Sequence, residues 1–343
     1  MPLILLIIKI YIKILNSKVY KLIMKILAIQ NRMGIGDTVI FLPYLEAISK
    51  KFNAPVSILV KKNSKAEQFL NQTNYIDKII FLERDAKKKG RHNGIMGTLR
   101  LAQDLKEHKF DKVFIFNSSL RFNLIAKLSG IKSIYQYPLF KKNNQHLTKP
   151  AIDLIKKNIN LAVNRNPQIQ IDKNLIKLAN LKFGINNNEL NILLAIGGSG
   201  PTKRIPSKTF LSVMEKINNL KKCKFFLATG TNEQEQIILN EIMNSKLKDK
   251  CFPLDKLSIA EILPIIKNCN VSICNDTSFS HLSSALGIKT ITLMADTPLV
   301  YGSYNSNMYP IIPNDETTVS HDTLGKDRID PEKIYNQLIS IIN

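Results

Sequence analysis

The chain has 343 residues, and its 44% hydrophobic and 22% charged residues are typical of a globular protein, which excludes wholesale disorder. No apolar run reaches the roughly 18–20 residues that span a bilayer, which excludes a polytopic membrane protein. The formal net charge of +22 suits an anionic membrane surface, an acidic acceptor or nucleic acid, but the chain has no basic-aromatic RNA motif and no zinc module, so we expect no nucleic-acid partner.

The N-terminal segment is apolar and basic. Residues 2–15 are apolar apart from two lysines one helical turn apart, Lys9 and Lys13. A secretory signal would place its positive charge before the apolar stretch, whereas the lysines here lie within it, so the pattern does not indicate such a signal. One interpretation is a helix that lies in the membrane interface and makes the protein peripheral on the inner face of the cytoplasmic membrane. The other is an upstream start codon, because residues 24–27 (Met-Lys-Ile-Leu) look like a native N-terminus that begins a strand.

From residue 25 onward, short apolar strands alternate with helices, a pattern that predicts parallel sheets with right-handed crossovers. In the first half we expect strands at 26–29, 56–60, 78–82 and 112–116, and helices at 38–52, 64–71, 98–108 and 121–128. An Asn-rich stretch with a helix at 173–183 follows. The alternation then restarts, with strands at 191–196, 223–228, 271–274 and 290–294 and helices at 207–219, 232–244, 258–269 and 278–286.

The repeated alternation predicts an α/β protein with two Rossmann-like domains that face a cleft. We expect an extension at 1–23, a first domain at 24–185, a second domain at 186–325 and a C-terminal helix within 326–343. Four scattered cysteines form no Cys-x-x-Cys pair and no metal-ligand spacing, which indicates free thiols in a reducing compartment. The cysteines therefore predict a cytoplasmic protein.

A loop with two glycines, residues 34–37 (Gly-Ile-Gly-Asp), follows the first predicted strand. It is not a dinucleotide fingerprint, because that spacing requires glycine where Val39 stands, and no Gly-Lys-Ser/Thr follows as in a P-loop. The loop opens at the carboxyl edge of the predicted sheet, where such folds bind ligands. Asp37 is therefore either a helix cap or a carboxylate presented to a ligand.

Two polar loops in the second half stand in the same position relative to a strand. Residues 197–204 (Gly-Gly-Ser-Gly-Pro-Thr-Lys-Arg) offer N–H groups, hydroxyls and cations before a helix, which suits a phosphate group; the alternative is a solvated turn. Residues 275–282 (Asn-Asp-Thr-Ser-Phe-Ser-His-Leu) begin a helix rich in hydroxyls, which can also meet an anion. There Asp276 is a cap or a functional carboxylate, and His281 contacts the anion or fills a buried turn.

These segments, in this order and spacing, resemble glycosyltransferase family 9, the heptosyltransferases of lipopolysaccharide synthesis. Residues 24–37 resemble the opening strand, loop, Gly-Asp and helix of that family, and residues 198–206 its small-residue and Lys-Arg segment. Residues 275–282 resemble its Asp-Thr-Gly-x-x-His-Leu signature, and residues 287–290 the start of the strand beyond. The resemblance covers residues 24–340 and implies the glycosyltransferase B fold.

The resemblance implies an inverting glycosyltransferase that moves a sugar from a nucleoside diphosphate, with ADP-heptose as the candidate donor. The acceptor would be an anionic glycolipid or glycan of the cell envelope, such as a lipopolysaccharide core. Asp37 matches the general base. The donor-binding residues that it implies are Ser199, Thr202, Lys203, Glu233 (with Asn232 as the alternative), Leu257, Asp276, Thr277, Ser278 and His281. The acceptor-binding residues are Gly36, Lys88, Arg91 and Arg121.

The chain departs from the family pattern near the donor. Ser278 replaces the signature glycine, Ile205 replaces a usual tryptophan, and residues 295–298 (Ala-Asp-Thr-Pro) are a shifted form of the usual motif. No Asp-x-Asp motif is present, so we expect neither a metal nor another cofactor. Because of these departures, the alternative function is a non-catalytic nucleotide-binding or partner-binding protein on the same fold.

Overall fold

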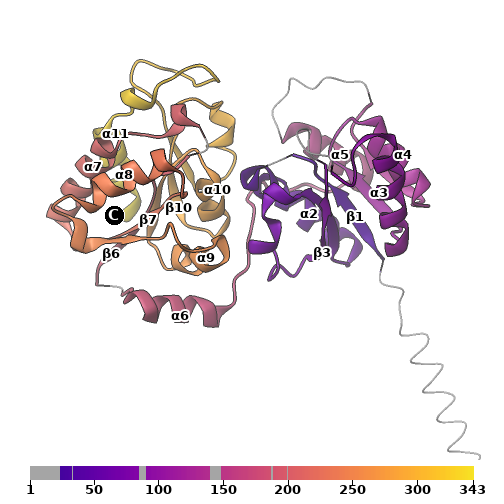
Figure 1. The fold of residues 1–343 in the computed structure, drawn as a ribbon, viewed down its shortest axis with the longest axis horizontal. Helices are drawn as coiled ribbons and strands as arrows, with labels where there is room; N and C mark the ends of the chain where they lie inside the picture. Colours follow the sequence, from indigo (N-terminus) through magenta and orange to yellow (C-terminus); the bar gives the residue numbers. More distant parts are fainter. Residues whose placement is uncertain (1–23, 33, 85–89, 140–147, 187, 199) are drawn as a thin grey trace, which may run out of the picture.

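Two parallel sheets, each covered by helices, form the chain (Figure 1). The computed structural model describes residues 24–32, 34–84, 90–139, 148–186, 188–198 and 200–343. The central strands are continuous apolar runs, as strands buried on both faces must be; all four residues of β1 (Ile26–Ile29) are buried. The predicted α/β class with two Rossmann-like domains is confirmed, whereas the expected extension at 1–23 lies outside the described residues.

The first sheet has the strand order β3-β2-β1-β4-β5. Its remaining strands are β2 (Val56–Lys61), β3 (Ile76–Leu82), β4 (Lys112–Ile115) and β5 (Ser133–Gln136). The helices of this domain are α2 (Ile35–Phe52), α3 (Gly94–His108), α4 (Leu120–Leu128) and α5 (Lys149–Ile159). The strand order reverses its direction between β1 and β4, and such a switch point opens a crevice for a ligand at the carboxyl ends of the strands.

The second sheet has the order β11-β10-β9-β6-β7-β8. Its strands are β6 (Leu190–Ala195), β7 (Cys223–Ala228), β8 (Cys251–Pro253), β9 (Val271–Asn275), β10 (Lys289–Leu293) and β11 (Met308–Ile311). The helices are α6 (Lys173–Phe183), α7 (Ser207–Leu220), α8 (Glu233–Met243), α9 (Ile259–Lys267), α10 (Ser278–Ala285) and α11 (Pro331–Ile342). The switch point here lies between β6 and β9.

The three segments singled out in the sequence all stand at the ends of strands at these switch points. Residues 34–37 are the N-cap and first turn of α2, which begins at residue 35 rather than at 38 as predicted; residues 197–204 follow β6, and residues 275–282 run from the end of β9 into α10. Helices α2 and α10 pack against each other across the two domains. One apolar cluster therefore runs through both domains, with Ile40 and Tyr44 of α2 and Leu282 of α10 among its members.

Some predicted elements differ from the structure. The helix expected at 64–71 is replaced by two short 3-10 turns, because Lys65 between them adopts a left-handed backbone with φ of 47°. The strands β5, β8 and β11 were not predicted; they are short, and two of them contain an internal or terminal proline (Pro310 and Pro253). Such strands lie at sheet edges, where little apolar pattern is required.

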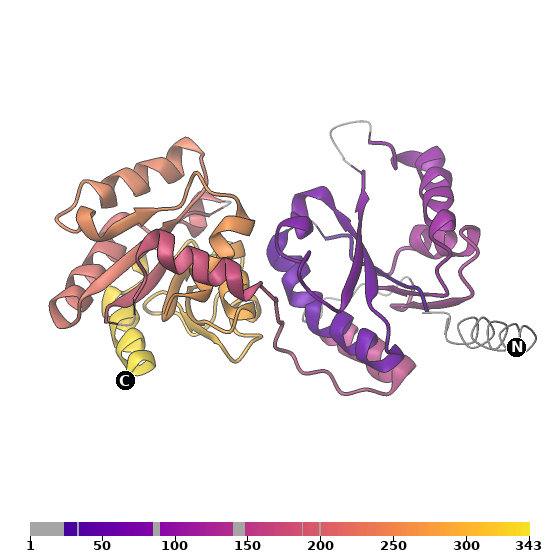
Figure 2. The same cartoon turned by 90° about the horizontal axis from the view of Figure 1, so that it is seen from below.

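The connection between the domains contacts both of them. The Tyr75 hydroxyl donates to the Gln168 carbonyl at 2.7 Å, and the Ile169 N–H donates to the Ala285 carbonyl at 3.0 Å. The following helix α6 packs against α9 beneath the second domain (Figure 2). Contacts with the second domain thus begin before residue 185, and the boundary expected at 185/186 stays a prediction.

Candidate active site

The loops that follow β6 and β9 are joined by one buried amide. The Asn275 Nδ2 donates to the carbonyl oxygens of Ile196 and Gly197, at 2.9 and 3.0 Å. Because β6 and β9 are neighbours in the sheet, Asn275 at the end of β9 can hold the loop that follows β6. This hydrogen bonding fixes the glycine-rich loop next to the start of α10 and brings two of the predicted phosphate-binding segments together.

Lys203 and Asp276 form an ion pair between these loops. Lys203 Nζ lies 2.9 Å from Asp276 Oδ2, and the Asp276 side chain is only 6% exposed. A buried carboxylate needs such a partner, because leaving it unpaired away from water is costly. The pair holds a cation beside the N-terminal turn of α10, where Thr277 is the N-cap residue and Ser278 the first helical residue. Thr277 and Ser278, both predicted as donor-binding residues, thus lie at one helix N-terminus, and such a terminus favours the binding of anions.

The acidic side chain directed at the glycine-rich loop is Glu235, which the sequence did not single out. Its Oε1 accepts from the Gly198 N–H at 2.6 Å, and its Oε2 accepts from the Asn232 side chain. Glu233, the predicted ribose contact, is exposed at the first position of α8. Asn232 and Glu235 stand three residues apart, as in a capping box. That spacing is the feature of the sequence from which the role of Glu235 could have been predicted.

Glycine is required where Glu235 packs. A Cβ on Gly197 would lie 2.9 Å from the Thr229 Oγ1 and would overlap the Glu235 carboxylate, and a Cβ on Gly230 would overlap the same carboxylate. The glycines therefore allow a buried carboxylate to approach the backbone at the carboxyl ends of β6 and β7. This geometry explains Gly197 and Gly230 as a packing requirement around Glu235.

Asp37 serves the start of its own helix with one oxygen. Its Oδ2 accepts from the Gly34 N–H at 3.1 Å, while its Oδ1 lies 3.8 Å from Arg32 Nη1. Oδ2 thus serves the helix start, and the role of Asp37 as a functional carboxylate stays a prediction. The N-cap position itself is occupied by Gly34.

Gly36 brings the two domains into contact at Asp37. A Cβ at this position would lie 2.7 Å from His281 Nε2 and would overlap the ring. His281 is 5% exposed, and its Nδ1 lies 2.9 Å from the hydroxyl of Tyr304, whose ring stacks on it. The first turn of α2 therefore rests on a histidine of the second domain, and Gly36, Asp37 and His281 form one group.

The charges around His281 come from both domains. Burial lowers the pKa of His281 most strongly; Lys203 also lowers it, while the carboxylates of Asp276 and Asp37 act in the opposite direction. Burial also raises the pKa of Tyr304, so its hydroxyl stays protonated and can donate to Nδ1. When the Tyr304 hydroxyl donates to Nδ1, the neutral ring carries its proton on Nε2.

Several buried side-chain oxygens near these loops have no hydrogen-bond partner among the described residues. They belong to Thr229, Asn275, Thr277 and Thr297, which stand at or just after the carboxyl ends of β7, β9 and β10. Buried polar atoms are normally paired, so such a group points to an absent ligand or water. Sequence reasoning found Thr277 in this set but missed Thr229 and Thr297.

Three predicted donor residues, Thr202, Leu257 and Ser199, remain to be placed. The Thr202 hydroxyl bonds to Asp296; burial raises the pKa of this carboxyl, but hydrogen bonds from the Leu324 N–H and Thr202 outweigh that effect and hold it below its usual value. Leu257 is half-buried in the loop between β8 and α9. Ser199 lies outside the described residues.

On the first domain, the predicted acceptor residues are partly engaged with neighbouring residues of that domain. Arg91 makes two hydrogen bonds to Asp104 of α3, at 2.5 and 3.2 Å. Arg121, in the first turn of α4, donates from Nη2 to the His92 carbonyl, and its buried Nε has no partner among the described residues. Arg91 and Arg121 are thus joined through His92, and Lys88 lies outside the described part of the chain.

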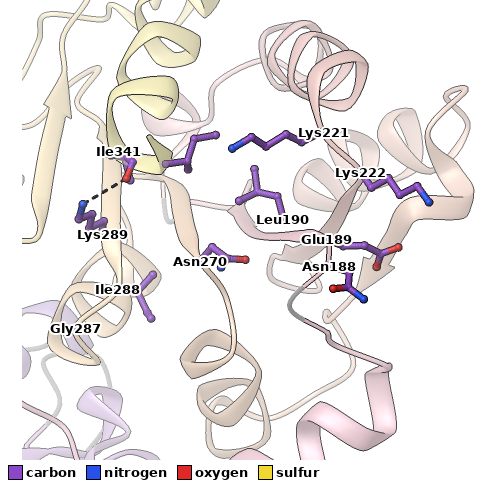
Figure 3. Close-up of a pocket in the computed structure, with 11 residues that line it drawn as sticks. Asn188, Glu189, Leu190, Lys221, Lys222, Asn270, Gly287, Ile288, Lys289 and Ile341 are labelled. Atoms are coloured by element: carbon purple, nitrogen blue, oxygen red, sulfur yellow. Dashed lines mark hydrogen bonds between the residues drawn. The ribbon is translucent and has the colours of Figure 1, made fainter.

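A hollow of about 680 Å³ lies at the opposite, amino edge of the second sheet (Figure 3). Lys221, Leu190 and Asn270 line it, and Lys289 Nζ donates to the Ile341 carbonyl at its rim. None of the predicted site residues belongs to it. Within the described residues, no group of three or more His, Cys, Asp or Glu could hold a metal ion, and no helix is long and apolar enough to cross a membrane.

The chain is similar to several known proteins. A family model described as glycosyltransferase family 9 (heptosyltransferase) matches residues 98–326. A lipopolysaccharide heptosyltransferase 1 from Campylobacter coli is 22% identical and covers 83% of this chain and 88% of its own length. A lipooligosaccharide heptosyltransferase 2 from Campylobacter jejuni is 24% identical over 77% of this chain and 78% of its own length.

Solved structures share the fold at lower identity. A family 9 glycosyltransferase from Veillonella parvula matches with a TM-score of 0.75 and 19% identity, covering 93% of this chain and 97% of its own. An ADP-heptose lipopolysaccharide heptosyltransferase II from E. coli matches with a TM-score of 0.72 and 16% identity, covering 93% and 98%. These matches confirm the predicted glycosyltransferase B architecture.

Proposed function

Because this chain belongs to glycosyltransferase family 9 (heptosyltransferase), we propose that it transfers heptose from ADP-heptose to a lipopolysaccharide core or a related cell-envelope glycan. The family and the glycosyltransferase class predicted from the sequence are thereby confirmed. The donor and acceptor are supported by the relatives, which are heptosyltransferases of lipopolysaccharide or lipooligosaccharide synthesis. An E. coli heptosyltransferase with the same fold was solved with ADP-2-deoxy-2-fluoro heptose.

The contact between Gly36 and His281 carries this proposal. It brings Asp37, on the first domain, close enough to act electrostatically on His281 of α10, on which Lys203 and Asp276 of the second domain also act. A transferase needs a base near the acceptor and cations near the leaving diphosphate, with the anomeric carbon between them. A protein that only bound a nucleotide would not need a carboxylate from the other domain at this position.

In the proposed reaction, Asp37 accepts the proton of an acceptor hydroxyl as the hydroxyl oxygen bonds to the anomeric carbon of the sugar. The bond between that carbon and the diphosphate oxygen breaks, and the diphosphate leaves with the electron pair. Because attack and departure occur on opposite faces, the anomeric configuration inverts. Lys203 and the N–H groups at the start of α10 stabilise the charge of the diphosphate.

The remaining donor contacts follow from the described surroundings. Thr277 and Ser278 stand at the N-terminal turn of α10, and Leu257 lies in the loop that would line the base. For the ribose, the buried Glu235 is better placed than the exposed Glu233, because it bonds to the glycine-rich loop. Arg121, with an unpaired Nε in the described residues, would meet an anionic acceptor.

A transfer assay with matched glycine variants tests the proposal. Purified protein is incubated with ADP-heptose and a soluble truncated core oligosaccharide, and the product is identified by mass spectrometry. Gly36→Ala should sharply reduce transfer, because its Cβ overlaps His281, whereas Gly200→Ala should retain it, because a Cβ there meets its nearest neighbour at 3.8 Å. Equal rates for the two variants would contradict the proposed site.

The same assay separates the alternative function. A non-catalytic nucleotide-binding protein would bind the donor but would neither transfer nor hydrolyse it. Donor binding is measured by calorimetry in parallel. A protein that binds the donor but shows no transfer is then tested with further acceptors before it is judged inactive. Donor binding without turnover, across a panel of nucleotide sugars and core acceptors, would favour the alternative.

A further inference from the structure

Helices α3 and α4 carry apolar side chains that no other described element covers. Ile95 is 83% exposed, and the others are between 46% and 61% exposed. We call this surface the α3–α4 face; it consists of Ile95, Met96, Leu99, Leu120, Leu124 and Leu128. Exposed apolar residues are ordinary when scattered, but a group on adjacent elements marks an interaction surface.

The residues of the α3–α4 face lie on two helices that pack against each other. Leu120, Leu124 and Leu128 stand four residues apart along α4 and therefore share one side of the helix. The two helices pack together, and the Ser129 hydroxyl donates to the Ala102 carbonyl at 3.0 Å between them. Both views show α3 and α4 on the side of the first domain remote from the second domain (Figures 1 and 2).

The core does not need these side chains. The opposite sides of α3 and α4 already fill the apolar cluster against the first sheet, with Leu101, Leu105, Phe122 and Ile125 among its buried members. A surface helix of a globular protein normally has one apolar stripe and one polar face. These two helices have apolar residues on both sides, so the outer set requires another explanation.

The charges around the face are predominantly basic. Along the two helices, the cations are Arg100, Lys106, Arg121 and Lys127, and the carboxylates are Asp104 and Glu107. Asp104 is already paired with Arg91. An apolar surface bordered by cations is complementary to a bilayer surface that carries anionic headgroups, because apolar side chains enter below the headgroups while the cations meet phosphates.

The start of the described chain lies on the same side. The Lys25 N–H donates to Asp111 Oδ2 at 2.8 Å, and Lys25 Nζ donates to the carbonyl of His108, the last residue of α3, at 3.3 Å. The apolar and basic sequence of residues 1–23 thus joins the protein at the end of α3. Two independent features, one of sequence and one of surface, are therefore connected through α3.

We propose that the α3–α4 face docks on the surface of an anionic phospholipid bilayer. The role of this docking rests on the proposed function, since a core acceptor is lipid-linked. Arg91 lies in the turn just before α3, and Arg121 lies in the first turn of α4. Docking would hold these acceptor contacts at the level of the headgroups, where the sugar of a lipid-linked acceptor is presented.

Vesicle sedimentation with the full chain tests the docking. Vesicles of phosphatidylcholine with phosphatidylglycerol are compared with phosphatidylcholine alone. Two uncharged double variants remove apolar contacts, Leu124→Gln with Leu128→Gln on α4, and Ile95→Gln with Leu99→Gln on α3. The matched control is Leu178→Gln with Leu181→Gln on α6, where both leucines are also exposed.

We expect the wild type to bind the anionic vesicles, and each α3–α4 double variant to bind about tenfold more weakly, a change of about 1.4 kcal/mol. The control should bind like the wild type, and high salt should weaken all binding. Unfolding midpoints confirm that each variant is folded; if one pair does not fold, the other pair decides.

Several results would overturn the docking proposal. These are absent binding of the wild type, unchanged binding of a folded α3–α4 variant, and an equal loss in the α6 control. A dimer that the α4 variant converts to a monomer without changed vesicle binding would show that a second copy covers the face instead. The vesicles contain neither donor nor acceptor, so a failure of vesicle binding would not contradict the proposed transferase activity. Conversely, a protein that is inactive in the transfer assay can still be tested for vesicle binding.

Discussion

The loops at the carboxyl edges of the two sheets differ in how far their polar groups are already paired. In the second domain, Asn275 holds the glycine-rich loop, Glu235 bonds to its backbone, and Lys203 pairs with Asp276. In the first domain, Asp37 has one oxygen bonded to its own helix and the other 3.8 Å from an arginine, and Arg121 keeps an unpaired Nε within the described residues. The second edge is cross-linked between its loops and still keeps unpaired oxygens of Thr229, Asn275, Thr277 and Thr297 within the described residues, whereas the first edge presents a carboxylate and an arginine.

This difference suits the two proposed substrates. A diphosphate is compact and highly charged, so a site whose donors are fixed in advance loses little on reorganising. The acceptor must be deprotonated and is larger, so the first domain supplies a base and exposed cations. Substitutions in the second domain should therefore affect donor affinity, while those in the first should affect the transfer rate or the acceptor KM.

The largest effect is expected for the base. Asp37→Asn should lower kcat by about 10²–10⁴-fold, the range for removal of a general base, while the amide oxygen can still accept from the Gly34 N–H. Rates are measured at saturating donor and acceptor, with Glu46→Gln on the same helix as the control. A variant with the full rate would remove Asp37 from the chemistry.

The next effect concerns the donor side. Lys203→Ala should weaken donor binding by about 1–3 kcal/mol, the range for a hydrogen bond to a charged group. It should also lower the unfolding midpoint, because it leaves the buried Asp276 without its partner. Calorimetry and thermal unfolding measure the two effects, with the exposed Lys208→Ala as the control. Unchanged donor affinity would exclude Lys203 from the donor site.

A smaller and more selective effect is expected for the acceptor cations. Arg121→Gln should raise the acceptor KM about tenfold, the equivalent of one charge-assisted hydrogen bond, and leave the donor KM unchanged. Lys109→Gln, beyond the end of α3, is the control. Arg91 is a poorer test of the same idea, because Arg91→Glu would place a second carboxylate beside Asp104. Equal changes in both KM values would argue against the division between the domains.

The pH dependence of stability should report the buried histidine. Burial lowers the pKa of His281 in the folded protein, so below about pH 6.5 the unfolded chain binds a proton that the folded one does not. The free energy of unfolding should therefore fall as the pH falls below about 6.5. Above that pH, His281 should contribute no pH dependence, because it is neutral in both states. Unfolding midpoints between pH 5.5 and 7.5 should depend less on pH in His281→Gln than in the wild type; identical slopes would contradict the assignment.

No effect is expected from metal removal. If Lys203 and α10 neutralise the diphosphate, transfer should be unchanged by a chelator, because no metal takes part in stabilising the leaving group. Rates with and without EDTA, and after readdition of Mg²⁺, provide the measurement. A rate that falls with EDTA and returns with Mg²⁺ would show that a metal is needed.

Much of the architecture was predictable because it depends on local pattern. Strands buried on both faces are apolar throughout, so β1, β6 and β9 were recognisable, and the polar loops after them identified the functional edge of each sheet. The short edge strands β5 and β11 were not, because all of β5 and the middle of β11 are only partly buried and show little apolar pattern. Lys65 broke an expected helix through its backbone conformation.

For the site, the sequence by itself determined which segments carry the chemistry, because hydroxyls, cations and glycines at strand ends are a local signal. Only the tertiary structure decided which atoms face one another. It directed Glu235 rather than Glu233 at the glycine-rich loop, paired Lys203 with Asp276, and placed Gly36 against His281. These choices depend on distances between strands and domains that are far apart in the chain, and sheet order and domain packing set those distances.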